Sequence, residues 1–261
     1  MELRDRVVIV TGSAAGIGAA AARMLAKAGA RVVVNYSKSE ADARAIEAEC
    51  RGLGAETLLV QANVAADADC RRMADAAMAK WGRLDGLINN AGQSKFVNHP
   101  DLDGLDAADF QAIYAVNVVG AFQMVRACLP HMRKTGHGSV VNISSIAGVM
   151  GVGSSIAYAA SKGALNTLTL SLARALGPTI QVNCLCPGFV QGRWMRGGLG
   201  EERYNARVRD QQENTPLRRA GTPEDMAEAA LMLLFGSRHI TGEILICDAG
   251  FHLGGAPVKA R

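Results

Sequence analysis

Short apolar runs rich in Val, Ile and Leu alternate along the chain with longer stretches in which apolar residues recur at helical spacing. The short runs predict strands, because β-branched residues favour extended backbone. They lie at 7–11, 31–35, 56–61, 84–89, 139–143, 180–185 and 243–247. The stretches between them predict helices that include 19–28, 40–51, 69–80 and 158–176, and a further long helix that runs from Ala107.

Strands that alternate with helices predict an α/β fold built from right-handed crossovers, with helices on both faces of a parallel sheet. The strand runs are almost continuously apolar, as expected for strands covered on both faces. No linker, repeat or low-complexity segment interrupts the alternation. We therefore predict a single doubly wound Rossmann domain over residues 1–261, with a seven-stranded parallel sheet.

One long segment, 188–216, departs from this alternation and is dense in Gly, Arg and Glu. It ends before Thr222-Pro223-Glu224-Asp225, which predicts a helix start with Thr222 as N-cap and Asp225 completing a capping box. Long inserts in compact domains are usually binding loops. We predict a substrate lid at about 189–216.

The composition is that of a globular protein, with 49% hydrophobic and 20% charged residues. The net charge of +4 comes without a basic run, which argues against a nucleic-acid partner. The N-terminus lacks the pattern of a signal peptide, and no apolar segment looks long enough to cross a bilayer. The six cysteines form no CxxC pair and no metal-ligand spacing. We expect reduced thiols, no metal, no membrane and a cytoplasmic location.

A glycine-rich turn follows the first predicted strand, with the sequence Thr11-Gly12-Ser13-Ala14-Ala15-Gly16-Ile17-Gly18. Glycine lets the backbone turn sharply and approach a ligand, and the following helix directs its N–H groups at a pyrophosphate. A glycine turn can also serve packing alone. Its place at the start of a series of strand–helix units favours dinucleotide binding.

Other short motifs follow in order along the chain: Asn89-Asn90-Ala91-Gly92, Asn117, Ser144-Ser145, Tyr158-Ala159-Ala160-Ser161-Lys162 and Pro187-Gly188. Together with the GxxxGxG turn they resemble the short-chain dehydrogenase/reductase superfamily over essentially the whole chain. Within it, the sequence is most similar to 3-oxoacyl-thioester reductases and to sugar and alcohol dehydrogenases. The resemblance implies an NAD(P)-dependent enzyme that moves a hydride between nicotinamide and a carbonyl or secondary alcohol.

Tyr158 and Lys162 are four residues apart and so share one helix face. A cation there should lower the pKa of the phenol and suit it to proton transfer. The resemblance implies that Tyr158 is the general acid/base and that Lys162 tunes it and binds the nicotinamide ribose. It also implies that Ser145 donates to the substrate oxygen and that Asn117 holds a relay water, although a helical Asn can simply bond backbone.

The second strand ends in Asn35-Tyr36-Ser37-Lys38 without the carboxylate that usually selects NAD. These residues could surround a 2′-phosphate, so we predict NADP(H), with NAD or dual use as the alternative. The full set of expected cofactor-binding residues is Gly12, Ser13, Ala15, Gly16, Ile17, Gly18, Asn35, Tyr36, Ser37, Lys38, Asn63, Val64, Asn90, Ala91, Gly92, Tyr158, Lys162, Pro187, Gly188 and Val190.

In family members the Pro-Gly loop passes the nicotinamide, and a threonine often adds a contact where this chain has Gly192. We expect a weaker nicotinamide clamp and a mobile lid, with Trp194 as an apolar anchor under it. Arg193 is a candidate anchor for an anionic substrate. The resemblance further implies a homodimer or homotetramer built through the two long helices.

The substrate is not defined by these motifs. A small ketone or sugar alcohol and a 3-oxoacyl thioester are both compatible with them. A carrier-bound thioester is the minority alternative, because 176–179 holds no basic residue and Arg126, Arg133 and Lys134 fit a solvated helix end. A catalytically idle dinucleotide-binding regulator is a different class of protein. Retention of both Tyr158 and Lys162 argues against it.

Overall fold

A computed structural model describes residues 3–254, and the ends of the predicted 1–261 domain lie outside the described residues. All seven predicted strands are present in one parallel sheet of order β3-β2-β1-β4-β5-β6-β7. The strands are β1 Val7–Val10, β2 Arg31–Tyr36, β3 Thr57–Gln61, β4 Gly86–Asn89, β5 Gly138–Ile143, β6 Ile180–Pro187 and β7 Ile244–Cys247. The doubly wound α/β fold is confirmed.

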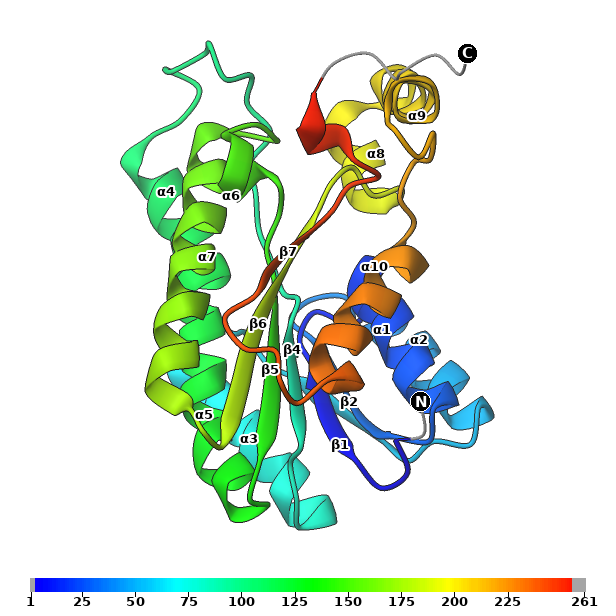
Figure 1. Cartoon of the computed structure of the whole chain (residues 1–261), viewed down its shortest axis with the longest axis vertical. Coiled ribbons are helices and arrows are strands. Elements are labelled where there is room, and N and C mark those ends of the chain that lie inside the picture. Colours follow the sequence, from blue (N-terminus) through cyan, green and yellow to red (C-terminus); the bar gives the residue numbers. More distant parts are fainter. Residues whose placement is uncertain (1–2, 255–261) are drawn as a thin grey trace.

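The helices lie on both faces of this sheet (Figure 1). Their bounds are α1 Gly16–Lys27, α2 Glu40–Gly52, α3 Asp67–Trp81, α4 Ala107–Tyr114, α5 Ala121–Lys134, α6 Ala147–Met150, α7 Ile156–Leu176, α8 Arg193–Leu199, α9 Glu201–Asn214 and α10 Pro223–Leu231. Two π-helical segments, η1 Ala115–Gly120 and η2 Met232–Gly236, and a 3-10 turn, η3 Phe251–Leu253, complete the fold. In Figure 1, α1, α2 and α10 cover one face, while α3, α5 and α7 cover the other.

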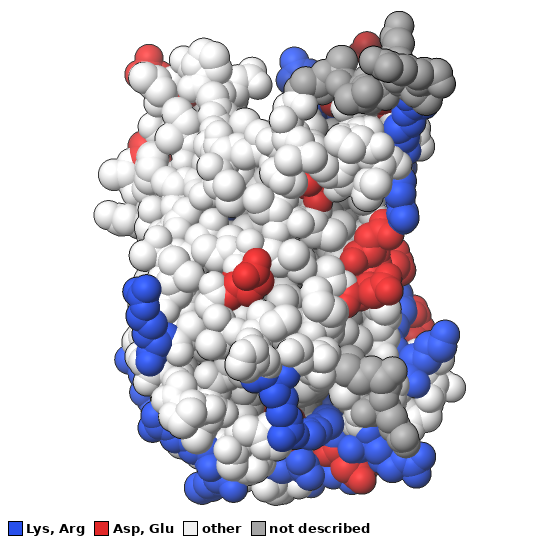
Figure 2. Space-filling view, in the orientation of Figure 1, with Lys and Arg blue, Asp and Glu red and all other residues white. Residues whose placement is uncertain are grey.

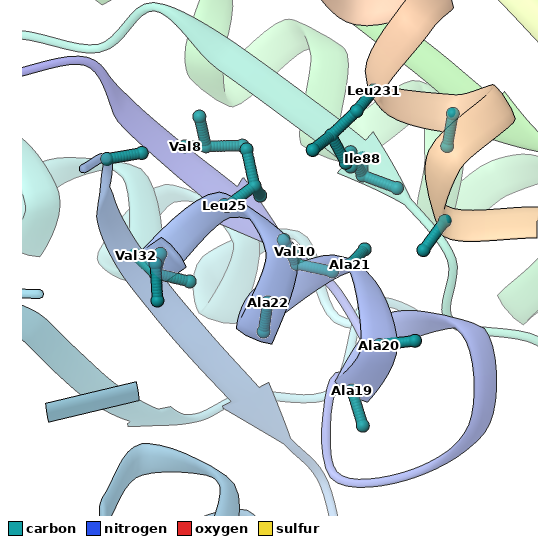
Figure 3. Packing of buried hydrophobic residues seen from close by; sticks show 14 of the residues in the cluster. Val8, Val10, Ala19, Ala20, Ala21, Ala22, Leu25, Val32, Ile88 and Leu231 are labelled. Atoms are coloured by element: carbon teal, nitrogen blue, oxygen red, sulfur yellow. The ribbon is translucent and has the colours of Figure 1, made fainter. Parts of the chain in front are cut away.

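Successive residues of β1 point to opposite faces, and each face has its own core. Val8 and Val10 pack with α1 and α10, whereas Val7 and Ile9 pack with α3, α5 and α7. Figure 3 shows the first of these cores, in which the small residues 19–22 of α1 pack among the sheet and the neighbouring helices. Small side chains let α1 lie close to the sheet, which fixes the glycine turn that precedes it.

One expectation about apolar segments is wrong. The continuous helical stretch Ala107–Lys134 is long and apolar enough to span a bilayer, and half of its most apolar window is buried inside the protein. It packs against α3 and α7, as a core helix does. The sequence predicted a long helix from Ala107, and the structure shows that α4, η1 and α5 form this one helix, which is longer and more apolar than expected.

The segment predicted to be a lid is largely helical. It folds into α8 and α9, which lie beyond the carboxyl ends of the strands (Figure 1). The capping box at the start of α10 is present, with the Thr222 hydroxyl accepting from the Asp225 N–H. On the face seen in Figure 2, most Lys and Arg side chains gather at the end opposite the lid.

Candidate active site

The motifs meet at one edge of the sheet, where β1, β4, β5 and β6 end. Parallel strands bring their carboxyl ends to the same edge, and the order of the sheet reverses between β1 and β4. Crevices at such a switch point are the usual ligand sites of doubly wound sheets. The predicted residues are therefore brought together by topology from distant parts of the chain.

The glycine turn is braced from two sides by asparagines. On the β2 side, the Asn35 Oδ1 accepts from the Gly12 N–H at 2.9 Å, and the Asn35 N–H donates to the Ser13 hydroxyl at 2.9 Å. On the β4 side, the Asn90 Nδ2 donates to the carbonyls of Thr11 and Gly12. The turn is thus held rigidly before any ligand binds.

Asn35 is buried and makes more hydrogen bonds within the protein than the sequence suggested. Its Nδ2 donates to the carbonyls of Tyr36, Val60 and Ala62, and the residue is 2% exposed. Both Oδ1 and Nδ2 form hydrogen bonds within the protein. The amide therefore has no free N–H to donate to a 2′-phosphate in this structure. Asn35 positions the turn, and Tyr36 is also buried.

Ser37 and Lys38 are the exposed residues that follow β2. Beyond β3, the Asn63 Oδ1 accepts from the Ala65 N–H at 3.1 Å, and Val64 is buried. The exposed polar groups at the end of β2 therefore include the hydroxyls of Ser37 and Ser39 and the ammonium group of Lys38.

The start of α1 fits an anionic ligand. Its N-cap is Ala15, and no side chain among the described residues caps the first turn. Gly16 has a φ of +57°, and a Cβ there would meet nothing within 4 Å, so the space beside the turn is open. At Gly18 a Cβ would come within 2.4 Å of Asn90 Nδ2, so only glycine allows this packing. An uncapped helix N-terminus with open space beside it suits a pyrophosphate.

Helix α7 carries the pair predicted to be catalytic, Tyr158 and Lys162. The Ser155 hydroxyl accepts from the Tyr158 N–H and caps the helix. Lys162 lies one turn further on, is 3% exposed and donates from Nζ to the Ile143 carbonyl at 2.8 Å. Its Nζ lies 5.5 Å from the centroid of the Tyr158 ring. The predicted juxtaposition of the two residues on one helix face is present.

The prediction that Lys162 lowers the pKa of Tyr158 is wrong for this structure. Desolvation raises the pKa of Tyr158 to about 12 and outweighs a hydrogen bond with Ser145. Desolvation also lowers the pKa of Lys162 to about 8. The sequence spacing revealed which groups are neighbours but not how much water reaches them, and burial is the larger effect on both groups.

Ser144 and Ser145 have different surroundings at the end of β5. The Ser144 hydroxyl donates to the Lys162 carbonyl at 3.1 Å and ties β5 to α7. The Ser145 hydroxyl accepts from the Ala147 N–H at 3.1 Å and hydrogen-bonds Tyr158. Ser145 is therefore the serine that faces the phenol.

Asn117 lies in the π-helical segment η1 and is buried. Its Oδ1 accepts from the Gln93 N–H, while its Nδ2 donates to the Gln93 carbonyl and to the Ser161 hydroxyl. The side chain is a clamp between the loop after β4 and α7. Gln93 was not singled out from sequence, and Ser161 appeared only as part of the motif that contains Tyr158, because only the fold brings them to Asn117.

The Pro-Gly loop is fixed by β7. The Gly188 N–H donates to the Cys247 carbonyl, and a Cβ on Gly188 would lie 2.6 Å from the Asp248 Cβ. Val190 forms a bridge with Gly221. Gly192 has a φ of +152°, a conformation that side chains rarely adopt, so the backbone explains why threonine is absent there.

Two expectations about the lid need correction. Trp194 is not buried under the lid: it is 47% exposed, and its ring centroid lies 6.4 Å from that of Tyr158. The Arg193 guanidinium pairs with Asp42 of α2 at 2.9 Å instead of standing free for an anionic substrate. No pattern in the sequence indicated this partner, because Asp42 lies 151 positions from Arg193.

The cysteines among the described residues are all free thiols. Cys184 and Cys186 share one face of β6 with their Sγ atoms 4.0 Å apart. Residues 3–254 contain no group of three His, Cys, Asp or Glu that could hold a metal.

Comparison with known proteins places this geometry in a family. A family profile described as enoyl-(acyl carrier protein) reductase matches residues 12–252. The chain is 41% identical to a Streptomyces violaceoruber protein named ketoacyl reductase 2 of the granaticin polyketide synthase, covering 95% of this chain and 96% of that one. It is 33% identical to the L-fucose dehydrogenase of Oryctolagus cuniculus, covering 97% and 87%.

A solved structure of a Burkholderia xenovorans protein described as a short-chain dehydrogenase/reductase agrees in fold, with a TM-score of 0.89 and 42% identity. It covers 97% of this chain and 100% of that one. The resemblance seen in the motifs is confirmed. The chain is an oxidoreductase that belongs to the short-chain dehydrogenase/reductase family.

Proposed function

We propose that the protein catalyses reversible hydride transfer between NADP(H) and a carbonyl or secondary alcohol. The observation that carries the proposal is the convergence of Ser145, Tyr158 and Lys162 beside an uncapped helix N-terminus. A hydroxyl that hydrogen-bonds a phenol, with an amine one helix turn away, is a proton-transfer site. The neighbouring turn and helix start suit the phosphates of a dinucleotide.

In the reducing direction, the substrate oxygen lies between the hydroxyls of Ser145 and Tyr158. A bound nicotinamide would supply the hydride to the carbonyl carbon and be oxidised. The phenolic proton of Tyr158 passes to the oxygen, so that the C=O bond becomes CH–OH. Ser145 donates to the same oxygen and stabilises the developing negative charge. With its pKa at about 12, Tyr158 carries the required proton at neutral pH.

The residues that would hold the cofactor are those expected from the sequence, with Asn35 acting through the turn. Ser37 and Lys38 are exposed where a 2′-phosphate would lie, which supports NADP(H) over NAD. Dual use is the alternative. Titration of the protein with NADPH and NADH tests this assignment, and tighter binding of NADH would overturn it.

The relatives indicate the reacting group of the substrate but not the substrate itself. The names of those relatives include a ketoacyl reductase and a sugar dehydrogenase, and both chemistries involve a carbonyl or secondary alcohol. Arg126, one candidate contact for an acidic carrier, pairs with Asp67 at 2.6 Å. This pairing supports a small free substrate over a carrier-bound thioester. We further propose one domain, a cytoplasmic location and a homodimer or homotetramer.

A carbonyl screen tests the proposal most simply. Purified protein is mixed with NADPH and a panel of ketones, sugars and one acyl-carrier thioester, and NADPH oxidation is followed. Turnover with a small ketone supports the proposal. Tight NADPH binding without oxidation by any carbonyl would instead support the idle regulatory alternative.

A further inference from the structure

Trp194 lies at the mouth of the catalytic site. Its ring meets that of Tyr158 at an interplanar angle of 60°, edge to face. Its Cη2 lies 3.6 Å from the position that a Cβ on Gly92 would occupy. The indole thus stands between the proton-transfer residue and the loop after β4, and 47% of the residue remains exposed.

Contacts at both ends of α8 hold this indole in place. At the start, Arg193 pairs with Asp42. Near the end, Gly198 packs so closely on Phe96 that a Cβ there would lie 2.1 Å from the ring. Trp194 is therefore carried by a helix that is fixed to α2 on one side and to the loop after β4 on the other.

The indole lies where α8 meets the loop after β4, and several polar side chains of these two segments already have partners. Lys95 pairs with Asp109 at 2.6 Å, and Arg196 pairs with Glu201 at 3.6 Å and stacks on the Tyr204 ring. The hydroxyls of Ser94 and Ser154 hydrogen-bond each other at 2.6 Å. These groups therefore present no unpaired charge or hydroxyl to a substrate, whereas the indole presents an apolar surface.

We propose that Trp194 is a specificity-determining residue that selects an uncharged, apolar ring at or next to the reacting carbonyl. A ring is flat enough to pack on the half-exposed indole while its oxygen reaches Ser145 and Tyr158. Aromatic packing of this kind favours a ring over an open chain of the same size. The inference rests on the proposed carbonyl reductase function and names its substrate class.

The test compares kcat/KM for cyclohexanone and 2-hexanone, which have equal carbon number but different shape. We expect the native protein to prefer cyclohexanone. Trp194→Ala should lower kcat/KM for cyclohexanone about tenfold and for 2-hexanone about threefold or less, and Trp194→Phe should restore most of the preference. Gly197→Ala is the matched control on α8, since a Cβ there meets nothing within 4 Å, and its ratio should stay native.

A ratio that does not change in Trp194→Ala would overturn the inference, as would preference for 2-hexanone or for a pyranose sugar. Failure to reduce either ketone while a charged carbonyl is turned over would overturn it too. Tyr158→Phe separates the two proposals. If that variant retains full turnover, the proposed function itself fails, whereas an unchanged ratio in Trp194→Ala refutes only the role of Trp194.

Discussion

A single side chain, that of Asn35, joins β2, β3 and the glycine turn. Its amide connects the end of β2 to the carbonyls of Val60 and Ala62 and to the Gly12 N–H. Buried amides that satisfy several backbone groups are costly to remove, because each abandoned partner loses its hydrogen bond without gaining water. The shape of the glycine turn thus depends on a residue outside it.

Asn35→Ala should lower the free energy of unfolding by roughly 2 to 4 kcal/mol, since it leaves several buried backbone groups unpaired. It should weaken NADPH and NADH binding by similar factors, because it disturbs the turn that both would share. Urea unfolding and fluorescence titration with both cofactors would measure these effects. Selective loss of NADPH binding would show that Asn35 contacts the 2′-phosphate after all.

Lys38→Ala should behave in the opposite manner. Lys38 is exposed, so the variant should unfold like the native protein within about 0.5 kcal/mol. Loss of its charge should weaken NADPH binding about tenfold or more and leave NADH binding unchanged, as expected for a charge-assisted contact to phosphate. Equal effects on the two cofactors would contradict this role for Lys38.

Burial of Lys162 gives the stability of the protein a distinctive pH dependence. Its pKa falls from 10.5 to about 8, so between these values the unfolded chain binds more protons than the folded one. The contribution of Lys162 to the free energy of unfolding therefore rises as the pH goes from 8 to 10.5. Below pH 8, burial of the charged amine destabilises the folded state by the full amount, roughly 3 kcal/mol.

Replacement of Lys162 by Met should make the protein more stable at pH 7, and the gain should shrink as the pH approaches 10. Urea unfolding of both proteins over this range would show the trend. Tyr158, which both proteins contain, has the opposite effect at higher pH. Its raised pKa makes the free energy of unfolding fall as the pH goes from 10 to 12. A difference between the two proteins that does not vary with pH would contradict the buried state of Lys162.

At the scale of elements, α8 is the part of the site that depends most on close packing. Gly197 and Gly198 lie side by side in this helix, yet only Gly198 faces a neighbour, the ring of Phe96. Two alanine variants therefore form a matched pair. Each raises helix propensity by about 1 kcal/mol, and only one forces α8 away from the loop after β4.

Gly198→Ala should raise KM for the carbonyl substrate several-fold, because it shifts the helix that carries Trp194 and Arg193. Gly197→Ala should leave KM unchanged. Steady-state kinetics at saturating NADPH would compare the two, with melting temperatures to confirm that both fold. Equal KM values would mean that α8 does not form a wall of the substrate site.

The regular elements and the motif order could be predicted from the sequence because both depend on local patterns. Apolar periodicity identified all seven strands, and the Tyr158–Lys162 spacing placed the pair on one helix face. The lid helices and the Arg193–Asp42 pair could not be predicted. They depend on glycine conformations and on contacts between residues far apart in the sequence, which no local pattern records.

At the scale of the whole molecule, the two long helices leave an apolar surface uncovered. Val119 is 47% exposed, Phe122 39% and Leu170 37%, and η1, which continues into α5, packs against α7. An exposed group of large apolar residues on neighbouring helices is typical of a protein interface. It supports the prediction that copies of this chain associate through these helices.

Phe122→Glu should reduce the mass measured by light scattering to that of a monomer. A charge buried at an apolar contact costs several kcal/mol, which is enough to dissociate a typical interface. Leu53→Glu, an exposed apolar residue at the end of α2, is the control and should keep the native mass. A monomeric native protein would refute the predicted association.

Tyr158 is expected to deliver the proton during hydride transfer, and the rate of a single turnover measures this step. Protein saturated with NADPH is mixed rapidly with cyclohexanone, and NADPH oxidation is followed for the native chain and for Tyr158→Phe. We predict a rate at least about 100-fold lower in the variant, with NADPH affinity unchanged within about twofold. An equal rate in the two proteins would show that a group other than Tyr158 delivers the proton.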